Sequence, residues 1–210
     1  MILIGQYDSP FVRRVAVALR LYGFDYEHRA LSVFGDTEAI GAINPLRRVP
    51  TFVTDDGEVL IESANILDWL DELAGPERAL IARSGLERRA ALKVCAMASG
   101  LADKAVSLVY ERVIHQRATA VWVARCEAQI EGVLDLLELD RARRGVWWFG
   151  DRIGHADIIT ACVLRFLGEA HPGLFDLARW PALGAHARAC EALPAFQAVA
   201  RPFTVTLPQA

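Results

Sequence analysis

The sequence predicts an α/β unit with the element order βαβαββα, followed by an all-α unit. In the first third of the chain, short apolar runs alternate with stretches in which apolar residues recur at helical spacing. After a polar connection at 77–85, only helical spacing remains. A chain of 210 residues is long enough for two small domains. We therefore expect an α/β domain at 1–77 and an all-α domain at 86–210.

The first strand is predicted at residues 2–7. Ser9-Pro10 then predicts the start of a helix, because serine is a preferred N-cap and proline is preferred at the first helical position. Apolar residues keep helical spacing until Gly23, which supplies a stop. Residues 26–33 predict the second strand.

A hairpin is predicted in the middle of the α/β unit. Residues 36–43 form a short, weakly amphipathic stretch that ends at Asn44-Pro45. Apolar runs at 51–53 and 59–61 then flank Asp55-Asp56-Gly57, a turn sequence typical of hairpins. These two runs are the expected third and fourth strands.

The remaining elements are predicted as helices. Ser63 starts a helix that Gly75-Pro76 ends. Farther along, apolar residues step by three and four at 94–108 and at 123–137. Another helix is expected at about 155–170, and shorter helices are expected within 181–200. The tail after Pro202 is expected to be extended.

Composition and charge exclude several classes of function. The formal net charge of −3 and the scattered arginines argue against nucleic-acid binding, which requires clustered cations. The opening run Met1-Ile2-Leu3-Ile4 is too short for a signal peptide, and no apolar run approaches a membrane span. We expect a cytoplasmic protein that binds neither nucleic acid nor membrane.

The cysteines and histidines predict no metal site. The cysteines are far apart and form no C-x-x-C pair, so we interpret them as buried, reduced thiols. No two histidines lie four residues apart, and we expect no cysteine partner that would suit a metal. The residues concerned are Cys95, Cys126, Cys162 and Cys190, and His28, His115, His155, His171 and His186.

Four local motifs, in this order and spacing, give the chain a family resemblance. They are Ser9-Pro10-Phe11-Val12-Arg13, Asn44-Pro45-Leu46-Arg47-Arg48-Val49-Pro50, Glu62-Ser63, and Gly150-Asp151-Arg152-Ile153-Gly154-His155-Ala156-Asp157. With the predicted element order, the chain resembles the glutathione transferase superfamily over essentially its whole length. The resemblance implies a thioredoxin-like N-terminal domain that binds glutathione, followed by an all-α domain.

The resemblance implies a catalytic role for Ser9. At the N-terminus of the first helix, backbone N–H groups and the helix dipole favour an anion, here the thiolate of glutathione, and the serine hydroxyl would donate to its sulfur. Alternatively, Ser9 is only a helix cap. Capping uses an oxygen lone pair and leaves the O–H proton, so one serine can serve both roles. Tyr7 is the rival hydroxyl, and its alternative role is packing.

The other motifs imply contacts to the rest of glutathione. Val49-Pro50 matches a segment that carries a cis-proline and offers the Val49 backbone to the cysteinyl backbone. A basic residue near the glycine carboxylate is expected at Arg48, although Arg47 remains an alternative. Glu62 and Ser63 would hold the γ-glutamyl end, with Glu62 reaching the ammonium; otherwise they are a solvated charge and a cap.

The motif before the sixth predicted helix has a folding role. Asp157 occupies the third helical position of a capping box, from which its side chain reaches back to the backbone of Gly154. The family usually has serine or threonine where Gly154 stands, so half of the reciprocal cap is missing. Trp147, Trp148 and Phe149, just before this motif, are expected in the core.

The function implied is a glutathione transferase that conjugates the thiolate to a small hydrophobic electrophile, as in detoxification. Glutathione is then the co-substrate, with no metal, and the protein is expected to be a homodimer. Phe11 and Tyr110, with Tyr7, are the expected electrophile pocket, between the domains. The alternatives are a non-enzymatic ligand-binding or regulatory module of the same fold, or glutathione-dependent peroxide reduction or isomerisation.

Overall fold

The chain forms two compact units. The computed structural model describes residues 1–114 and 119–205. Unit 1 comprises Met1–Arg83 together with the chain from Pro194 onward, and unit 2 comprises Ser84–Leu193. Unit 1 contains the sheet and unit 2 is helical, so the predicted fold class is confirmed.

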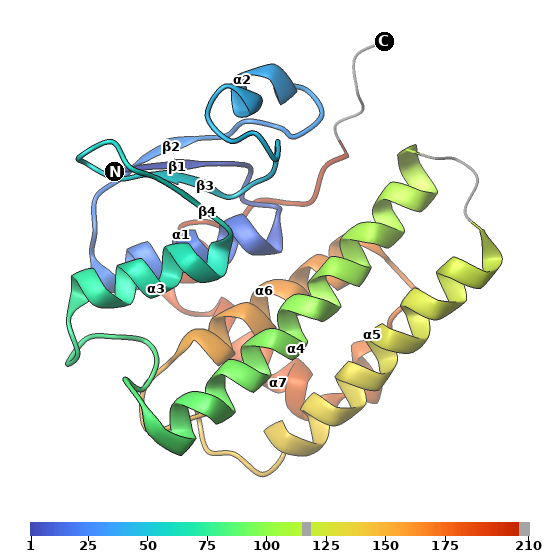
Figure 1. Cartoon of the computed structure of the whole chain (residues 1–210). Coiled ribbons are helices and arrows are strands. Elements are labelled where there is room, and N and C mark those ends of the chain that lie inside the picture. Colours follow the sequence, from blue (N-terminus) through green and yellow to red (C-terminus); the bar gives the residue numbers. More distant parts are fainter. Residues whose placement is uncertain (115–118, 206–210) are drawn as a thin grey trace. The chain divides into compact units, whose positions relative to one another are not determined.

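A mixed four-stranded sheet forms the centre of unit 1 (Figure 1). The strands are β1 (Ile2–Ile4), β2 (Glu27–Arg29), β3 (Thr51–Val53) and β4 (Val59–Ile61), in the order β2-β1-β3-β4. β1 runs parallel to β2 and antiparallel to β3, with Leu3 opposite Phe52. β3 and β4 are antiparallel, which confirms the predicted hairpin.

Three helices accompany the sheet. They are α1 (Pro10–Tyr22), α2 (Thr37–Gly41) and α3 (Ser63–Ala74). Figure 1 shows α1 and α3 together on one face of the sheet and α2 on the other side. α1 begins after the cap Ser9 and ends at Gly23, whose φ of 69° places it in the left-handed region, as predicted. The core between sheet and helices contains the fully buried side chains of Leu3, Ile4, Val15, Leu19, Phe52, Ile66 and Leu70.

The C-terminal part of the chain completes unit 1. Helix α8 (Pro194–Gln197) packs on α1, and Phe196 is fully buried. Arg13 of α1, itself only 2% exposed, donates from Nη2 to the carbonyl oxygen of Phe196 at 3.1 Å. Its guanidinium carbon also lies 5.5 Å from the centre of the Phe196 ring. The expected division at 1–77 and 86–210 therefore differs from the observed one at the C-terminal end.

Unit 2 is helical. Its elements are α4 (Gly85–Val109), the π-helical turn η1 (Tyr110–Ile114), α5 (Ala120–Arg141), α6 (His155–Ala170), the 3-10 turn η2 (Leu177–Arg179) and α7 (Pro181–Glu191). α6 packs against both α4 and α7 and buries twelve of its sixteen residues. Such a helix, apolar nearly all round, is expected at the centre of a helical core.

The N-terminus of α6 has the predicted carboxylate cap. The Asp157 carboxylate accepts from the backbone N–H groups of Gly154 and Trp148, both at 2.9 Å. His186 Nε2 of α7 lies 3.2 Å from Asp157 Oδ1. Burial and the nearby Arg141 lower the pKa of His186 to about 4, so the imidazole is neutral near pH 7 and this contact is a hydrogen bond. Asp157 thus connects the start of α6 to α7, in keeping with the folding role.

The aromatic side chains near this cap and the cysteines of unit 2 are largely internal. Trp148 is buried, as expected, whereas Trp147 and Phe149 are only partly buried. All four cysteines lie in the described part of the chain and none forms a disulfide. Three of them are buried, and Cys95 is partly exposed.

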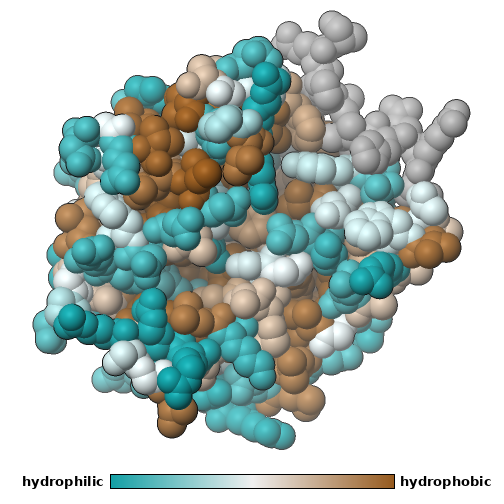
Figure 2. Space-filling model, in the orientation of Figure 1, coloured by the Kyte–Doolittle hydropathy of each residue, from teal (hydrophilic) through white to brown (hydrophobic). Residues whose placement is uncertain are grey.

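Apolar side chains also reach the surface of unit 1. On the face shown in Figure 2, they gather in the area where Figure 1 draws the strands. β4 is an edge strand and its Val59 is exposed, as is Leu73 of α3. Exposed apolar side chains near a sheet edge are typical of surfaces that contact another protein.

Candidate functional site

Ser9 lies at the N-terminal end of α1. Its backbone is extended (φ −68°, ψ 125°), and its Oγ accepts a hydrogen bond from the Val12 N–H at 3.4 Å. The side chain is partly exposed. Because capping uses only a lone pair, the O–H proton can be directed to a second acceptor. The predicted cap is present, and the geometry is compatible with the additional donor role.

Gly5 allows the loop before β3 to approach the first turn of α1. Its φ is 128°, a backbone conformation that side-chain-bearing residues rarely adopt. A Cβ at this position would lie 2.6 Å from Val12 Cγ2 and 2.8 Å from Val49 Cβ. Val49 and Val12 of the first turn of α1 therefore both crowd the space where a Gly5 side chain would lie, which brings the Val49-Pro50 segment close to the Ser9 cap.

The loop that carries the expected binding residues is fixed by Asn44. Asn44 is 1% exposed, and its Nδ2 donates to the Arg48 carbonyl oxygen at 3.0 Å and to Thr51 Oγ1 at 2.9 Å. The Val49–Pro50 peptide bond is cis, as the resemblance implies. The sequence assigned Asn44 only to the end of a helix. Its position between a predicted helix and a predicted strand was the available sequence signal for its second role.

The two arginines of this loop have different partners. Arg48 Nη1 lies 3.1 Å from Glu62 Oε1, whereas Arg47 Nη1 lies 3.0 Å from Glu38 Oε1 of α2. The structure thus brings Arg48 together with Glu62, which is also an expected site residue. Of the two alternatives, Arg48 is the one placed beside the other predicted contacts.

Glu62 adopts a strained conformation at the start of α3. Its φ is 66° and its ψ 123°, an unfavourable combination for a residue with a side chain. It is the N-cap residue, but no side chain caps α3 by hydrogen bonding. Ser63 is buried as the first helical residue rather than the cap. The N–H groups of the first turn, which have no partner within a helix, are suited to binding a carboxylate.

Tyr7 is held by its neighbours. Its ring stacks on His28, with the ring centres 3.7 Å apart and the planes nearly parallel, and its hydroxyl lies 2.8 Å from that of Tyr26. Burial and the Tyr26 contact raise the pKa of the Tyr7 hydroxyl. These contacts favour the packing interpretation over the role of rival hydroxyl.

The residues expected in the electrophile pocket belong to different units. Phe11 lies on α1 of unit 1 and is partly exposed. Tyr110 belongs to unit 2, where it begins η1 and is 38% exposed. The partial exposure of both side chains is compatible with contact to a small molecule.

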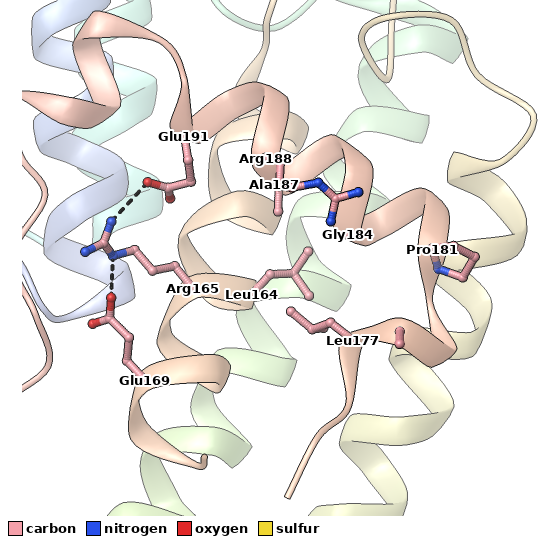
Figure 3. Close-up of a pocket in the computed structure, with 10 residues that line it drawn as sticks. Leu164, Arg165, Glu169, Leu177, Pro181, Gly184, Ala187, Arg188 and Glu191 are labelled. Atoms are coloured by element: carbon pink, nitrogen blue, oxygen red, sulfur yellow. Dashed lines mark hydrogen bonds and ion pairs between the residues drawn. The ribbon is translucent and has the colours of Figure 1, made fainter. Parts of the chain in front are cut away.

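A cavity in unit 2 belongs to a different part of the molecule. It has a volume of about 670 Å³ and is lined by residues of α6, η2 and α7. Figure 3 shows Leu164 and Leu177 pointing toward one another on its floor. Both carboxylates that line it, Glu169 and Glu191, are paired with Arg165. None of the expected glutathione-binding residues lines this cavity.

The described residues contain neither a metal-binding cluster nor a membrane-spanning helix. Within 1–114 and 119–205, no group of three or more histidine, cysteine, aspartate or glutamate side chains is placed to hold a metal ion. His115, one of the histidines considered above, lies outside these residues. In the same part of the chain, no helix combines the length and apolarity needed to cross a membrane.

The fold and the site define a protein class. Unit 1 combines a four-stranded mixed sheet with a cis-proline loop, an open helix N-terminus and a serine at the start of α1, and unit 2 is helical. This is the architecture of a thioredoxin-like thiol-binding protein with an added helical domain. The profile described as "Glutathione S-transferase, N-terminal domain" matches residues 3–78, and the corresponding C-terminal domain profile matches residues 120–189. The chain belongs to the glutathione S-transferase family.

Individual relatives agree with this assignment. The chain is 32% identical over 172 residues to the uncharacterized GST-like protein YibF of Escherichia coli K12, covering 80% of this chain and 82% of that protein. It is 30% identical over 207 residues to the maleylacetoacetate isomerase of Pseudomonas aeruginosa, covering 94% of each. A glutathione S-transferase from Methylobacterium radiotolerans, solved in complex with glutathione sulfonate, is similar in structure with a TM-score of 0.90 and 29% identity, covering 100% of this chain and 98% of that one.

Proposed function

We propose that this protein ionises the thiol of glutathione at Ser9 and transfers the resulting thiolate to a small hydrophobic electrophile. The observation that carries the proposal is the position of Ser9: its oxygen caps α1 while its O–H proton is available at the positive end of that helix. Family membership and the relative bound to glutathione sulfonate support glutathione as the ligand.

The proposed binding contacts are made to parts of glutathione other than its reacting sulfur. In the proposed complex, the first-turn N–H groups of α3 bind the γ-glutamyl carboxylate, Glu62 accepts from the ammonium, and the Val49 backbone pairs with the cysteinyl residue. Arg48 binds the glycine carboxylate. These groups bind parts of glutathione that do not react, so they supply affinity and orientation rather than a chemical step.

The chemical step requires a thiolate. The thiol proton leaves to solvent, and the Ser9 hydroxyl donates a hydrogen bond to the sulfur anion, which lowers the pKa of the bound thiol. The sulfur lone pair then forms a bond to the electrophilic carbon. In a substitution, the leaving group departs with the electron pair of its bond. In an addition, the π-electron pair of the attacked double bond moves to the neighbouring atom, which then takes a proton from solvent.

The principal test separates binding from turnover. We expect the protein to be retained on immobilised glutathione and to consume one thiol per product with electrophiles such as 1-chloro-2,4-dinitrobenzene. Retention without turnover against a panel of electrophiles would support a ligand-binding or regulatory module. Absence of glutathione binding would contradict the proposal.

A second candidate is glutathione-dependent isomerisation. It is favoured by the similarity to the Pseudomonas aeruginosa maleylacetoacetate isomerase, which extends over 94% of both chains. In this reaction the thiolate adds to a carbon–carbon double bond, the bond rotates, and the thiolate leaves again. Product formation with no net loss of thiol therefore distinguishes isomerisation from conjugation.

We also propose a cytoplasmic homodimer. The exposed apolar side chains of Leu46, Val59 and Leu73 in unit 1 support a surface that contacts a second copy. Sedimentation at micromolar concentration is expected to give the mass of a dimer. A monomer under these conditions would contradict this part of the proposal.

A further inference from the structure

The chain returns to α1 after leaving unit 2. Phe196 and Val199 are fully buried in unit 1, and the hydrogen bond from Arg13 Nη2 to the Phe196 carbonyl oxygen fixes α8 against α1. In Figure 1, the red segment that follows α8 runs back along the α1 side of unit 1. The start of the last segment is therefore firmly anchored near the helix that carries Ser9.

Beyond this anchor, the segment contacts the turn that precedes α1. The Thr204 N–H donates to Asp8 Oδ2 at 3.2 Å, and Asp8 directly precedes Ser9. Hydrogen bonds from the Thr204 hydroxyl and from the Ser9 N–H also stabilise this carboxylate, although burial raises the pKa of Asp8 overall.

We propose that Asp8 is a positioning residue that holds residues 201–205 beside Ser9, where the segment forms one wall of the electrophile site. Phe203 and Val205 flank Thr204 on this segment; Phe203 is partly exposed and Val205 is exposed, so both offer apolar surface on the segment that Asp8 holds. In this proposal, Asp8 does not contact glutathione. This inference rests on the proposed function, because it specifies where the electrophile lies.

Four variants of the full chain test the contact. Asp8→Ala removes the acceptor, whereas Asp8→Asn retains an acceptor oxygen without the charge. Thr204→Pro removes the backbone donor, whereas Thr204→Ser retains both the N–H and the hydroxyl. Amide hydrogen exchange of residues 201–205 is measured without ligand. Calorimetry gives the glutathione Kd, and steady-state kinetics with 1-chloro-2,4-dinitrobenzene give kcat and KM.

Asp8→Ala and Thr204→Pro are expected to behave alike. Both should speed amide exchange in 201–205 and raise the KM for the electrophile by about fivefold, the effect of losing one hydrogen bond. The glutathione Kd should stay within about twofold, because the lost contact lies outside the glutathione groups. Asp8→Asn and Thr204→Ser should restore most of the wild-type KM. The double variant Asp8→Ala/Thr204→Pro should be no worse than either single change, because both remove the same contact.

Three results would overturn the inference. Unchanged exchange in Asp8→Ala would mean that Asp8 does not hold the segment. Additive effects in the double variant would mean that Asp8 acts on the Ser9 turn directly. A change in glutathione Kd with no change in the KM for the electrophile would place Asp8 in the glutathione site. Failure of the wild type to bind glutathione would contradict the proposed function, while the exchange measurement would still report on the Asp8–Thr204 contact.

Discussion

Arg48 and Glu62 form an ion pair, with Arg48 Nη1 3.1 Å from Glu62 Oε1, although the β3–β4 hairpin separates them in sequence. Their side chains are 57% and 48% exposed, so the pair contributes little to the stability of the fold. It does place a cation and an anion side by side. Such an arrangement suits a ligand like glutathione, which carries both carboxylates and an ammonium group.

Arg48→Gln is expected to weaken glutathione binding by about tenfold or more, because a hydrogen bond between charged groups contributes roughly 1.5 to 3 kcal/mol. Arg47→Gln is the matched control, since Arg47 is paired with Glu38 instead, and its Kd should stay within about twofold of wild type. Calorimetric titration of both variants measures the difference. Equal losses of glutathione affinity in the two variants would show that Arg48 contributes no more to binding than Arg47 does.

Removing the Ser9 hydroxyl is expected to raise the apparent pKa of the bound glutathione thiol by about one to two units, since a hydrogen bond to an anion is worth roughly 1.5 to 3 kcal/mol. Thiolate absorbance of the complex against pH measures this shift. The capping bond to the Val12 N–H is long, at 3.4 Å. Its loss in Ser9→Ala should therefore cost stability near the low end of the usual range, about 0.5 kcal/mol.

Ser9→Gly separates the two roles of this residue. Glycine retains most of the capping benefit but lacks the donor, so its thiol pKa should rise as in Ser9→Ala while stability stays close to wild type. If the glycine variant titrates like wild type, Ser9 is only a cap. Tyr7→Phe would then be the next test, although the contacts of Tyr7 with Tyr26 and His28 lead us to expect a wild-type titration from that variant.

Glu62→Gly is expected to weaken glutathione binding while leaving the fold as stable as wild type or more stable. Glycine adopts a φ of 66° without the steric cost that glutamate has, but it lacks the carboxylate. Glu62→Gln, which keeps the strain and loses the charge, is the control for binding. Urea unfolding and calorimetry report the two effects separately. A destabilised glycine variant would contradict the strain argument.

His186→Gln is expected to reduce the acid sensitivity of the fold. The pKa of His186 is about 4 in the folded state, below its ordinary value of 6.5, so between these values the unfolded chain binds a proton that the folded chain does not. The free energy of unfolding should therefore fall as pH is lowered from 6.5 toward 4. Glutamine does not titrate and can still donate to Asp157.

The comparison is made by urea unfolding at pH 7 and pH 5. The variant should lose less stability than wild type over this interval. The raised pKa of Asp157, caused by its burial, acts in the opposite direction and is present in both proteins, so the difference between them isolates His186. Parallel losses in the two proteins would show that His186 is not the titrating group.

Local signals predicted the parts of the fold that depend on neighbouring residues. Ser9-Pro10 started α1, Gly23 ended it, Asp55-Asp56-Gly57 formed the hairpin turn, and Asp157 capped α6. Each of these features is a backbone or capping preference within a few residues, which makes it readable from sequence. The expected strand at 26–33 was too long, because only Glu27–Arg29 pair with β1.

Long-range partners were not predictable in this way. The choice of Arg48 rather than Arg47 depends on which guanidinium faces Glu62 once the loop is folded. Asn44 also fixes the loop before β3, and this role depends on two hydrogen-bond acceptors that the folded loop supplies. Glutamate disfavours a positive φ, so the positive φ of Glu62 is maintained by the surrounding structure. The contact of Thr204 with Asp8 joins residues almost a full chain length apart.

The order of synthesis has a consequence for unit 1, because that unit is assembled from both ends of the chain. While the ribosome is still making α7, the sheet and α1 already exist, but the carbonyl group that Arg13 binds and the ring of Phe196 have not yet been added. The apolar surface that α8 covers stays exposed until residues 194–199 have been synthesised. We therefore expect unit 1 to mature after unit 2, so that a chain stopped just before Pro194 exposes an incomplete first unit to proteases and chaperones.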